Sequence, residues 1–366
     1  MSKEIALCCI GSHSALDVAA GARAQGLRSL IVTARGRERT YTESFRRREQ
    51  PVPRGCVDEV IELERFTDML DAAVQDRLLA ENAIFVPNRS FEVYMRQAFS
   101  YDEIERGMRV PLFGNRRLLR FEERDESKNQ YALLRKADIL HPVQFPSPEE
   151  IDRLVMVKAP HARVSFERAF FLCSSPREYR ETAARLIDEG TITEEGLASA
   201  VIEEYVLGPA INLNFFYSPM LRELELLGTD TRRQTNLEGL RNLPPSALDA
   251  VRTVPMRLEE AGHIAATMTE SMLESAFAMG EAFLAAASEA MAPGVIGPFA
   301  LQCTIVAGPP KALVCYDVSL RIPGSPGTRF TPYSAYRWGR DVSVGERIAM
   351  EVLFARDAKC LDRVLT

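Results

Sequence analysis

The apolar positions at the start of the chain alternate between a strand pattern and a helix pattern. Six consecutive apolar residues at 5–10 predict a buried parallel strand. Apolar positions then recur at helical spacing up to residue 25, and a second apolar run at 29–33 completes a right-handed βαβ unit. The same alternation predicts a strand at 57–63, a helix at 68–82 and a strand at 83–87. We therefore expect a doubly wound α/β domain, in which ligands bind beyond the carboxyl ends of the strands.

The turn between the first strand and its helix carries Gly11, Ser12, His13 and Ser14. Backbone N–H groups at the helix start, two hydroxyls and an imidazole could converge there on one anion. The same residues also fit an ordinary turn in which Ser14 caps the helix, supported by Asp17 three residues later. The local sequence leaves both interpretations open.

Two more polar groups are expected near this turn. Asn88, Arg89 and Ser90 directly follow a predicted strand, and the carboxyl ends of parallel strands lie at the same edge of a sheet. Asn115 and Arg116 follow a Phe-Gly turn, where an arginine could clamp a phosphate or a carboxylate. Arginines in such a position are also common as plain surface charge.

The pattern changes after a proline-rich connector at 142–148, which is the best candidate for a domain boundary. A strand at 154–158 ends in a lysine, and a strand at 169–173 can form a hairpin with it. Runs at 211–217 and 223–227 alternate polar and apolar residues, which predicts an antiparallel sheet with one solvated face. The other expected elements are helices at 118–137, 178–189, 271–291 and 344–357, and strands at 200–206, 298–303 and 311–318.

Composition excludes several classes of protein. The chain has 366 residues with 46% hydrophobic and 26% charged positions, which is ordinary for an enzyme of two or three lobes. A net charge of −6 argues against a general nucleic-acid binder, and no stretch has the length of a membrane span. The seven cysteines include no CxxC pair and the four histidines are scattered, so a structural zinc site is not expected. Cysteines within apolar runs indicate reduced thiols and a cytoplasmic protein.

Several stretches taken together resemble ATP-grasp ligases. An α/β domain is followed by a strand–loop–strand segment with a lysine, then by a Glu-Glu-Tyr-Val strand and a sheet lobe with late acidic residues. More specifically, the chain is similar to the formate-dependent 5-formaminoimidazole-4-carboxamide ribonucleotide (FAICAR) synthetases of archaeal purine synthesis. The matching stretches are 10–14, 113–117, 202–206, 216–219, 296–302 and 332–334.

The resemblance implies an ATP-grasp fold of class α/β in three parts. An N-terminal doubly wound domain at 1–118 would bind the nucleotide substrate. Residues 119–208 would form the small α+β subdomain, with a lid at 159–168, and residues 209–366 the large α+β subdomain. Relatives of this family assemble, so a homo-oligomer is expected.

The resemblance also implies the chemistry. ATP would phosphorylate a small carboxylate, formate in this family, to an acyl phosphate. The amine of an aminoimidazole carboxamide ribonucleotide (AICAR) would then attack the acyl carbon. Such a reaction depends on cations and positioning more than on a covalent nucleophile, and it calls for ATP and Mg²⁺. The expected partners are a phosphorylated nucleotide and a small carboxylate, with no nucleic acid and no membrane.

Site residues follow from the matching positions. Those implied to bind the nucleotide substrate are Gly11, Ser12, His13, Ser14, Asn115 and Arg116, and Asn88, Arg89 and Ser90 are added because the sheet topology places them beside the same turn. Those implied to bind ATP are Lys158, Arg163, Glu203, Glu204, Tyr205 and Val206. Lys158, Arg168 and Arg321 would be catalytic, and Gln302 and Asp317 would face Mg²⁺, a hard ion that prefers oxygen ligands.

This chain departs from the family pattern near the ATP phosphates and the reacting centre. Its lid at 159–168 contains no glycine, whereas the family's lid is rich in glycine and arginine. Asn88 and Arg89 stand where the family has His-Gly, and Asp317 stands where it has a longer Glu. Downstream, at 321–329, this chain carries arginines where the family continues to an asparagine, and arginine cannot bind magnesium.

Three hypotheses are therefore compatible with the sequence. The chain is a divergent FAICAR-type carbon–nitrogen ligase, a paralogue that joins a different acid and amine in specialised nucleoside metabolism, or a nucleotide-binding protein that has lost catalysis. The first two differ in the product formed with formate. The third predicts nucleotide binding without release of ADP.

Overall fold

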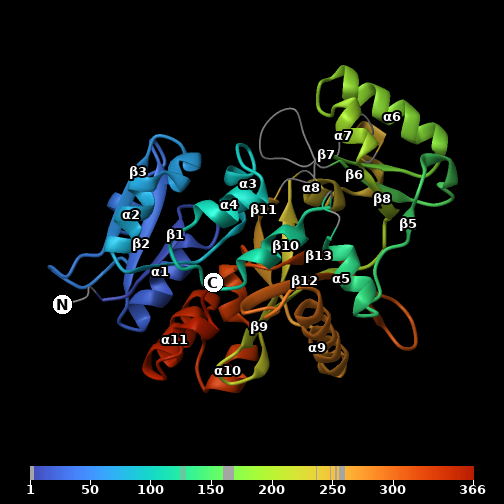
Figure 1. The fold of residues 1–366 in the computed structure, drawn as a ribbon. Coiled ribbons are helices and arrows are strands. Elements are labelled where there is room, and N and C mark those ends of the chain that lie inside the picture. Colours follow the sequence, from blue (N-terminus) through green and yellow to red (C-terminus); the bar gives the residue numbers. More distant parts are fainter. Residues whose placement is uncertain are drawn as a thin grey trace.

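A computed structural model describes residues 4–124, 126, 128–159, 169–235, 237–247, 249–251, 254 and 260–366. Figure 1 shows an N-terminal domain at the left, a small sheet at the upper right and a larger lobe between and below them. Each of these three parts contains one sheet. The predicted lid lies outside the described residues except for Ala159, the last residue of a strand.

The N-terminal domain is a parallel sheet with helices on both faces, as predicted. Its strands are β1 (Ala6–Ile10), β2 (Arg28–Ala34), β3 (Glu59–Leu63) and β4 (Ala83–Phe85), in the order β3-β2-β1-β4. One apolar cluster joins this sheet to α1 (Ala15–Ala24), and a second joins its other face to α2 (Ala72–Ala80), α3 (Arg89–Met95) and α4 (Tyr101–Gly107). The apolar runs of β1 and β2 are buried because both faces of the sheet are covered.

The start of α1 differs from the expected cap. Ser14 makes no capping hydrogen bond, and its hydroxyl donates instead to the carbonyl oxygen of Pro323. Asp17 does not complete a capping box either, because its Oδ2 accepts a 2.9 Å hydrogen bond from the backbone N–H of Gly345. Both side chains therefore connect the N-terminal domain to the larger lobe.

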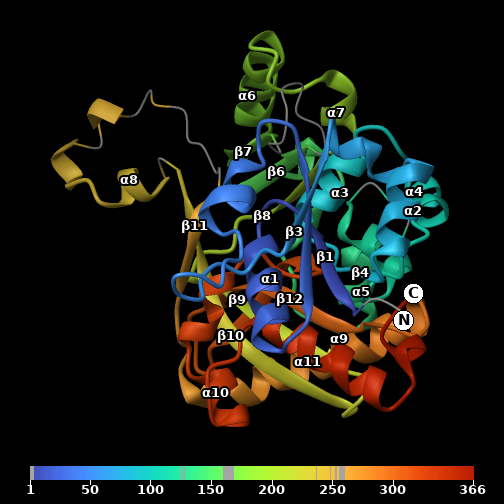
Figure 2. The ribbon, with the colours of Figure 1, turned by 90° about the vertical axis from the view of Figure 1, so that its left-hand side faces the viewer.

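A close contact between two helices strengthens this connection. Helix α11 (Val344–Asp357) lies against α1, and the two lie next to each other in Figure 2. A Cβ atom on Gly21 of α1 would stand 2.2 Å from the backbone of Gly345. Only glycine leaves room for backbones that approach so closely.

The small sheet is antiparallel and has the order β5-β8-β6-β7. Its strands are β5 (Gln144–Phe145), β6 (Val155–Ala159), β7 (Ala169–Cys173) and β8 (Val201–Glu204). The predicted hairpin is confirmed, since Val155 pairs with Cys173 in the β6–β7 ladder. Helices α6 (Pro176–Asp188) and α7 (Glu194–Ala198) complete this part.

The larger lobe contains an antiparallel sheet of five strands in the order β11-β10-β9-β12-β13. The strands are β9 (Ala210–Ser218), β10 (Glu223–Gln234), β11 (Glu260–Ala265), β12 (Gly297–Val306) and β13 (Ala312–Ser319). Helix α9 (Leu273–Ala290) covers one face, where Phe283 stacks on Phe299. The other face carries polar side chains, as predicted, but Asn212, Asn214 and Gln302 on it are buried, so this face is not openly solvated. Short helices α8 (Leu237–Arg241) and α10 (Tyr333–Trp338) belong to the same lobe.

Two long helices predicted from the sequence are interrupted. The one expected at 118–137 consists of a 3-10 turn at Arg116–Glu122 and a separate helix α5 (Gln130–Lys136). Helix α5 begins at Asn129, whose Oδ1 accepts hydrogen bonds from two backbone N–H groups of the first turn. Similarly, the helix expected at 68–82 starts as a 3-10 turn and becomes α-helical only after Asp71. Helix α5 packs against α9 and β13, so this segment lies on the larger lobe.

Candidate functional site

A cavity of about 810 Å³ lies where the three parts meet. Of the residues predicted for the site, those that line it are His13, Arg89, Lys158, Glu203, Glu204, Tyr205, Val206, Gln302, Asp317 and Arg321. Residues that stand 190 positions apart in sequence, such as those of the first turn and those of β8, thus share one space. Arg163 and Arg168 fall outside the described residues.

One wall of the cavity is built around Lys158. This residue is on β6, beside β8 in an antiparallel ladder, and its ammonium group forms an ion pair with Glu203 of β8. Both side chains are almost fully buried, 4% and 3% exposed. Burial lowers the pKa of Lys158, and the nearby carboxylate of Glu203 opposes that shift. The carboxylate also accepts a 2.7 Å hydrogen bond from the hydroxyl of Tyr131, so the side chain of Glu203 has two partners within the protein.

The two residues predicted to face magnesium lie directly opposite each other. Gln302 of β12 pairs with Asp317 of β13 in the ladder. Each is bound to an arginine: Arg124 Nη2 lies 2.8 Å from Asp317 Oδ1, and Arg232 Nη2 donates to Gln302 Oε1 at 3.0 Å. Burial lowers the pKa of Arg124, but the carboxylates of Asp317 and Glu203 together with Tyr131 outweigh burial and raise it.

The side-chain oxygens of Gln302 and Asp317 suit a metal ion that binds together with a nucleotide. No cluster of three or more His, Cys, Asp or Glu side chains among the described residues could hold a metal by itself. Mg²⁺ is commonly bound by one or two carboxylates together with substrate phosphates and water. Asp317 and the amide oxygen of Gln302 supply such an incomplete set of oxygen ligands.

The N-terminal turn meets the loop after β13. Asn88 and Ile322 form a parallel bridge, and Asn88 Nδ2 donates to the carbonyl oxygens of Ile10 at 2.9 Å and Ser12 at 3.2 Å. Asn88 therefore lies behind the turn and holds its shape. His13 lines the cavity with a left-handed backbone, φ 42°, which is uncommon outside glycine and frequent at binding sites.

The imidazole of His13 is neutral at pH 7. Burial is the main cause that lowers the pKa of His13 to about 4, and the positive charge of Arg321 is the second. A Cβ atom on Gly324 would lie 2.9 Å from His13 Nδ1, so this ring stands directly against the loop after β13. His13 can therefore accept or donate a hydrogen bond to a phosphorylated ligand, but it brings no positive charge.

A histidine that sequence reasoning missed lines the cavity beside His13. His263 of β11 contacts the buried carboxylate of Asp230 through Nδ1, and its Nε2 lies 3.1 Å from Glu260 Oε1. Although burial lowers the pKa of His263, its two carboxylate partners raise it to about 9. Although burial raises the pKa of Glu260, the hydrogen bond with His263 and the positive charges of Arg232 and His263 together lower it to about 2. This pair is therefore ionised at neutral pH.

Arg89 and Arg321 share two buried glutamates at the same end of the cavity. Arg89 Nη1 lies 3.7 Å from Glu92 Oε2 and 3.8 Å from Glu122 Oε2. Arg321 approaches the same two oxygen atoms at 3.7 and 3.4 Å. Burial and the neighbouring charge of Glu122 raise the pKa of Glu92 well above its ordinary value.

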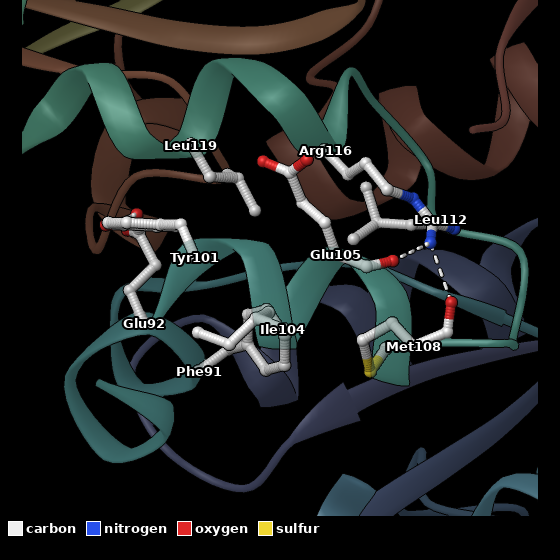
Figure 3. A pocket seen from close by; sticks show the side chains of 9 residues that line it. All are labelled: Phe91, Glu92, Tyr101, Ile104, Glu105, Met108, Leu112, Arg116 and Leu119. Atoms are coloured by element: carbon white, nitrogen blue, oxygen red, sulfur yellow. Dashed lines mark hydrogen bonds between the residues drawn. The ribbon is translucent and has the colours of Figure 1, made fainter. Parts of the chain in front are cut away.

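Arg116 and Asn115 do not lie where a role in binding the nucleotide substrate would place them. Figure 3 shows Arg116 beside a small, separate cavity of about 10 Å³, with its guanidinium directed at the carbonyl oxygens of Glu105 and Met108. Asn115 Nδ2 donates to the carbonyl oxygens of Met291 at 3.1 Å and Gly294 at 3.0 Å. Neither residue lines the large cavity, and neither do Gly11, Ser12, Ser14, Asn88 and Ser90.

Comparison with known proteins covers the whole length of the chain. Residues 178–366 match a family described as "Domain of unknown function (DUF1297)", and residues 7–145 match one described as "Protein of unknown function (DUF1246)". The 5-formaminoimidazole-4-carboxamide-1-(beta)-D-ribofuranosyl 5'-monophosphate synthetase of Methanopyrus kandleri is 40% identical over 366 residues, which are 100% of this chain and 96% of that protein. Its counterpart in Methanocaldococcus jannaschii is 34% identical over 99% of this chain and 95% of the relative.

Solved structures agree with this match. The crystal structure of an IMP biosynthesis protein PurP from Thermococcus kodakaraensis has a TM-score of 0.72 at 26% identity, covering 98% of this chain and 100% of that one. The biotin carboxylase domain of Hydrogenobacter thermophilus 2-oxoglutarate carboxylase, solved with MgADP, has a TM-score of 0.61 at 14% identity, covering 94% of this chain and 69% of that one. A parallel N-terminal sheet followed by two antiparallel sheets is thus the ATP-grasp fold, as predicted.

Proposed function

The chain belongs to the family of 5-formaminoimidazole-4-carboxamide ribonucleotide synthetases, and on that premise we propose that it is an ATP-dependent carbon–nitrogen ligase that joins formate to AICAR. The match to the Methanopyrus kandleri synthetase, at 40% identity over the full chain, is the observation that carries this proposal. The cavity supports it, because residues implied to bind ATP and residues implied to bind the nucleotide substrate open into the same space.

We propose two chemical steps. A formate oxygen attacks the γ-phosphorus of ATP, which breaks the bond to ADP and yields formyl phosphate. The amine nitrogen of AICAR then attacks the formyl carbon, and the phosphate leaves with the proton that the amine loses. Lys158 and Arg321 would stabilise negative charge on the transferred phosphoryl group. Gln302 and Asp317 would hold the magnesium ion, whose chemistry when bound is to neutralise the phosphates.

We assign the nucleotide substrate to the N-terminal side of the cavity. The neutral imidazole of His13, the residue of the 11–14 turn that lines the cavity, would bind its phosphate by a hydrogen bond. ATP would lie on the side of Lys158, with its adenine along residues 204–206. Arg163 and Arg168 remain predicted ligands of the ATP phosphates. The seven described cysteines are free thiols, which suits a cytoplasmic enzyme, and a homo-oligomer remains a prediction.

A different acid–amine pair is the second candidate function. It is favoured by the end of the cavity where Arg89, which stands in place of a glycine in the family pattern, shares Glu92 and Glu122 with Arg321. A buried group of this kind changes the shape and charge that a substrate meets. The third candidate is a protein that has lost catalysis. It is favoured by the lid at 159–168, which contains no glycine.

Incubation of the purified protein with ATP, Mg²⁺, formate and AICAR tests the proposal, with each component omitted in turn. We expect ADP and the formylated nucleotide only in the complete mixture. ADP that forms without the formylated product, or only with another acid or amine, would favour the paralogue. Binding of ATP or AICAR without any ADP would favour the protein that has lost catalysis.

A further inference from the structure

Arg124 lines the cavity at the metal-facing edge, although no motif in the sequence marks it. It follows the 3-10 turn at Arg116–Glu122, and its side chain is only 8% exposed. Its Nη2 lies 2.8 Å from Asp317 Oδ1, whereas its buried Nε has no hydrogen-bond partner within the part of the chain that the structure describes. Buried N–H groups are nearly always hydrogen-bonded, so an unused donor at a cavity wall indicates a ligand.

Arg124 is also one end of a continuous row of buried charges. The carboxylate of Glu203 binds Lys158 on one side and the neutral hydroxyl of Tyr131 on the other, and both the Tyr131 hydroxyl and the Glu203 charge act on Arg124. Two cations and two carboxylates, including Asp317, thus balance to zero. Without a ligand, each cation of this row already has a carboxylate partner.

A magnesium nucleotide that binds at this row competes with Arg124 for Asp317. Arg124 contacts Asp317 Oδ1, the metal needs an oxygen of the same carboxylate, and arginine has no lone pair to offer a metal. The phosphates need cations, and a guanidinium offers several N–H donors in a planar fork that suits phosphate oxygens. If Asp317 binds the metal instead of Arg124, the guanidinium of Arg124 becomes available to bind a phosphate.

We propose that Arg124 is a phosphate-binding residue of the nucleotide site, with Asp317 as its counter-ion until a magnesium nucleotide takes that place. The proposal rests on the proposed function in one respect, namely that the cavity binds ATP on the side of Lys158. Beyond that, it assigns to Arg124 a contact that neither the motifs nor the resemblance supplies.

Calorimetric titration with ADP, once in EDTA and once in excess Mg²⁺, separates the two roles of Arg124. In EDTA no metal can involve Asp317, so a change in affinity reports on contact with phosphate. We expect Arg124→Met to weaken ADP binding in EDTA at least tenfold. Asp317→Asn should leave the EDTA affinity unchanged or improve it, because Arg124 loses its competitor, and it should abolish the gain from Mg²⁺.

Arg120→Met is the matched control. Arg120 lies in the same 3-10 turn and binds the carboxylate of Glu105 at 2.9 Å, but it does not line the cavity. Its ADP affinity should equal that of the unchanged protein. Arg124→Lys keeps the charge without the planar fork and should give an intermediate affinity, and AICAR titration of every variant checks that the site is folded.

Two results would overturn the proposal. If folded Arg124→Met binds ADP in EDTA as the unchanged protein does, Arg124 only anchors Asp317. If Asp317→Asn and Arg124→Met lose affinity equally in EDTA, the pair is a structural support. If the unchanged protein itself binds no ADP under either condition, the proposed ATP site is wrong, which is a different failure.

Discussion

The two ends of the cavity hold their charges in different ways. Around Lys158 and Arg124, each cation has one carboxylate in direct contact, and Arg124 lies 2.8 Å from Asp317. At the N-terminal end, Arg89 and Arg321 share Glu92 and Glu122 at 3.4 to 3.8 Å, and Arg321 Nε and Glu92 Oε2 are buried without a hydrogen-bond partner among the described residues.

This difference suggests two ways of receiving a ligand. Buried ion pairs gain little by themselves, but breaking one is costly because the remaining charge is left without a partner. At the Lys158 end, a ligand must therefore supply new partners for the pairs that it opens. At the N-terminal end, Glu92 and Glu122 each contact both arginines, so a ligand that binds one arginine there leaves each glutamate with the other.

Replacement of Lys158 should cause the largest effect. We expect Lys158→Ala to lower the rate of ADP formation by about 10²–10³-fold, since a cation at the transferred phosphate is removed. It should also lower the free energy of unfolding by about 3 kcal/mol, because Glu203 stays buried without its partner. An activity assay and urea denaturation measure the two effects. The double variant Lys158→Met, Glu203→Gln should recover stability but not activity, and unchanged ADP formation would remove Lys158 from the mechanism.

Replacement of His13 should affect only the other end. We expect His13→Ala to weaken AICAR binding by about 10-fold, the value of one hydrogen bond to a charged group, and to leave the affinity for ATP unchanged. Titration of the variant with each ligand separately measures this. An equal loss of both affinities would show that the two ends of the cavity have been assigned incorrectly.

Gly324→Ala should have a smaller effect at the same place. The new Cβ would stand 2.9 Å from His13 Nδ1, so the ring must move by a few tenths of an ångström. We expect the KM for AICAR to rise several-fold while the KM for ATP stays the same. Gly327→Ala is the control, since no atom lies within 4 Å of its added Cβ. A rise in both KM values would place Gly324 at the shared reaction centre instead.

A further expected effect is a pH dependence of stability. The pKa of His263 rises from 6.5 to about 9 on folding. Its protonation therefore stabilises the fold fully below pH 6.5, by roughly 3 kcal/mol, and this contribution is lost as the pH rises through 9. Thermal unfolding between pH 6 and 10 should show this slope, which His263→Gln should flatten. An equal slope in that variant would assign the titration to another group.

The sequence predicted those features that depend on local pattern. Alternating apolar runs indicated the parallel sheet, and regular strand spacing predicted the hairpin with Lys158 and the separate strands that carry Gln302 and Asp317. Strand β11 was missed because Glu260–Ala265 has few β-forming residues and contains a glycine at φ 139°.

Other features depend on contacts between distant segments. Arg124 looks like surface charge until β13, 193 residues later in the chain, places Asp317 against it. For Arg116 the error is the reverse. Its position after a Phe-Gly turn predicts a phosphate ligand, but its side chain binds backbone carbonyl oxygens. The sequence alone does not show which partner the fold provides for an arginine.

The contact between Gly21 and Gly345 has a consequence for how the enzyme opens. Helix backbones in such close contact have little room to move relative to each other. We therefore expect the N-terminal sheet and the five-stranded sheet to move as one rigid body. Access to the cavity then depends on the small sheet, which is joined to this rigid body by the segments before β5 and after β8. We expect hinge bending at these two segments to set the rate at which products leave.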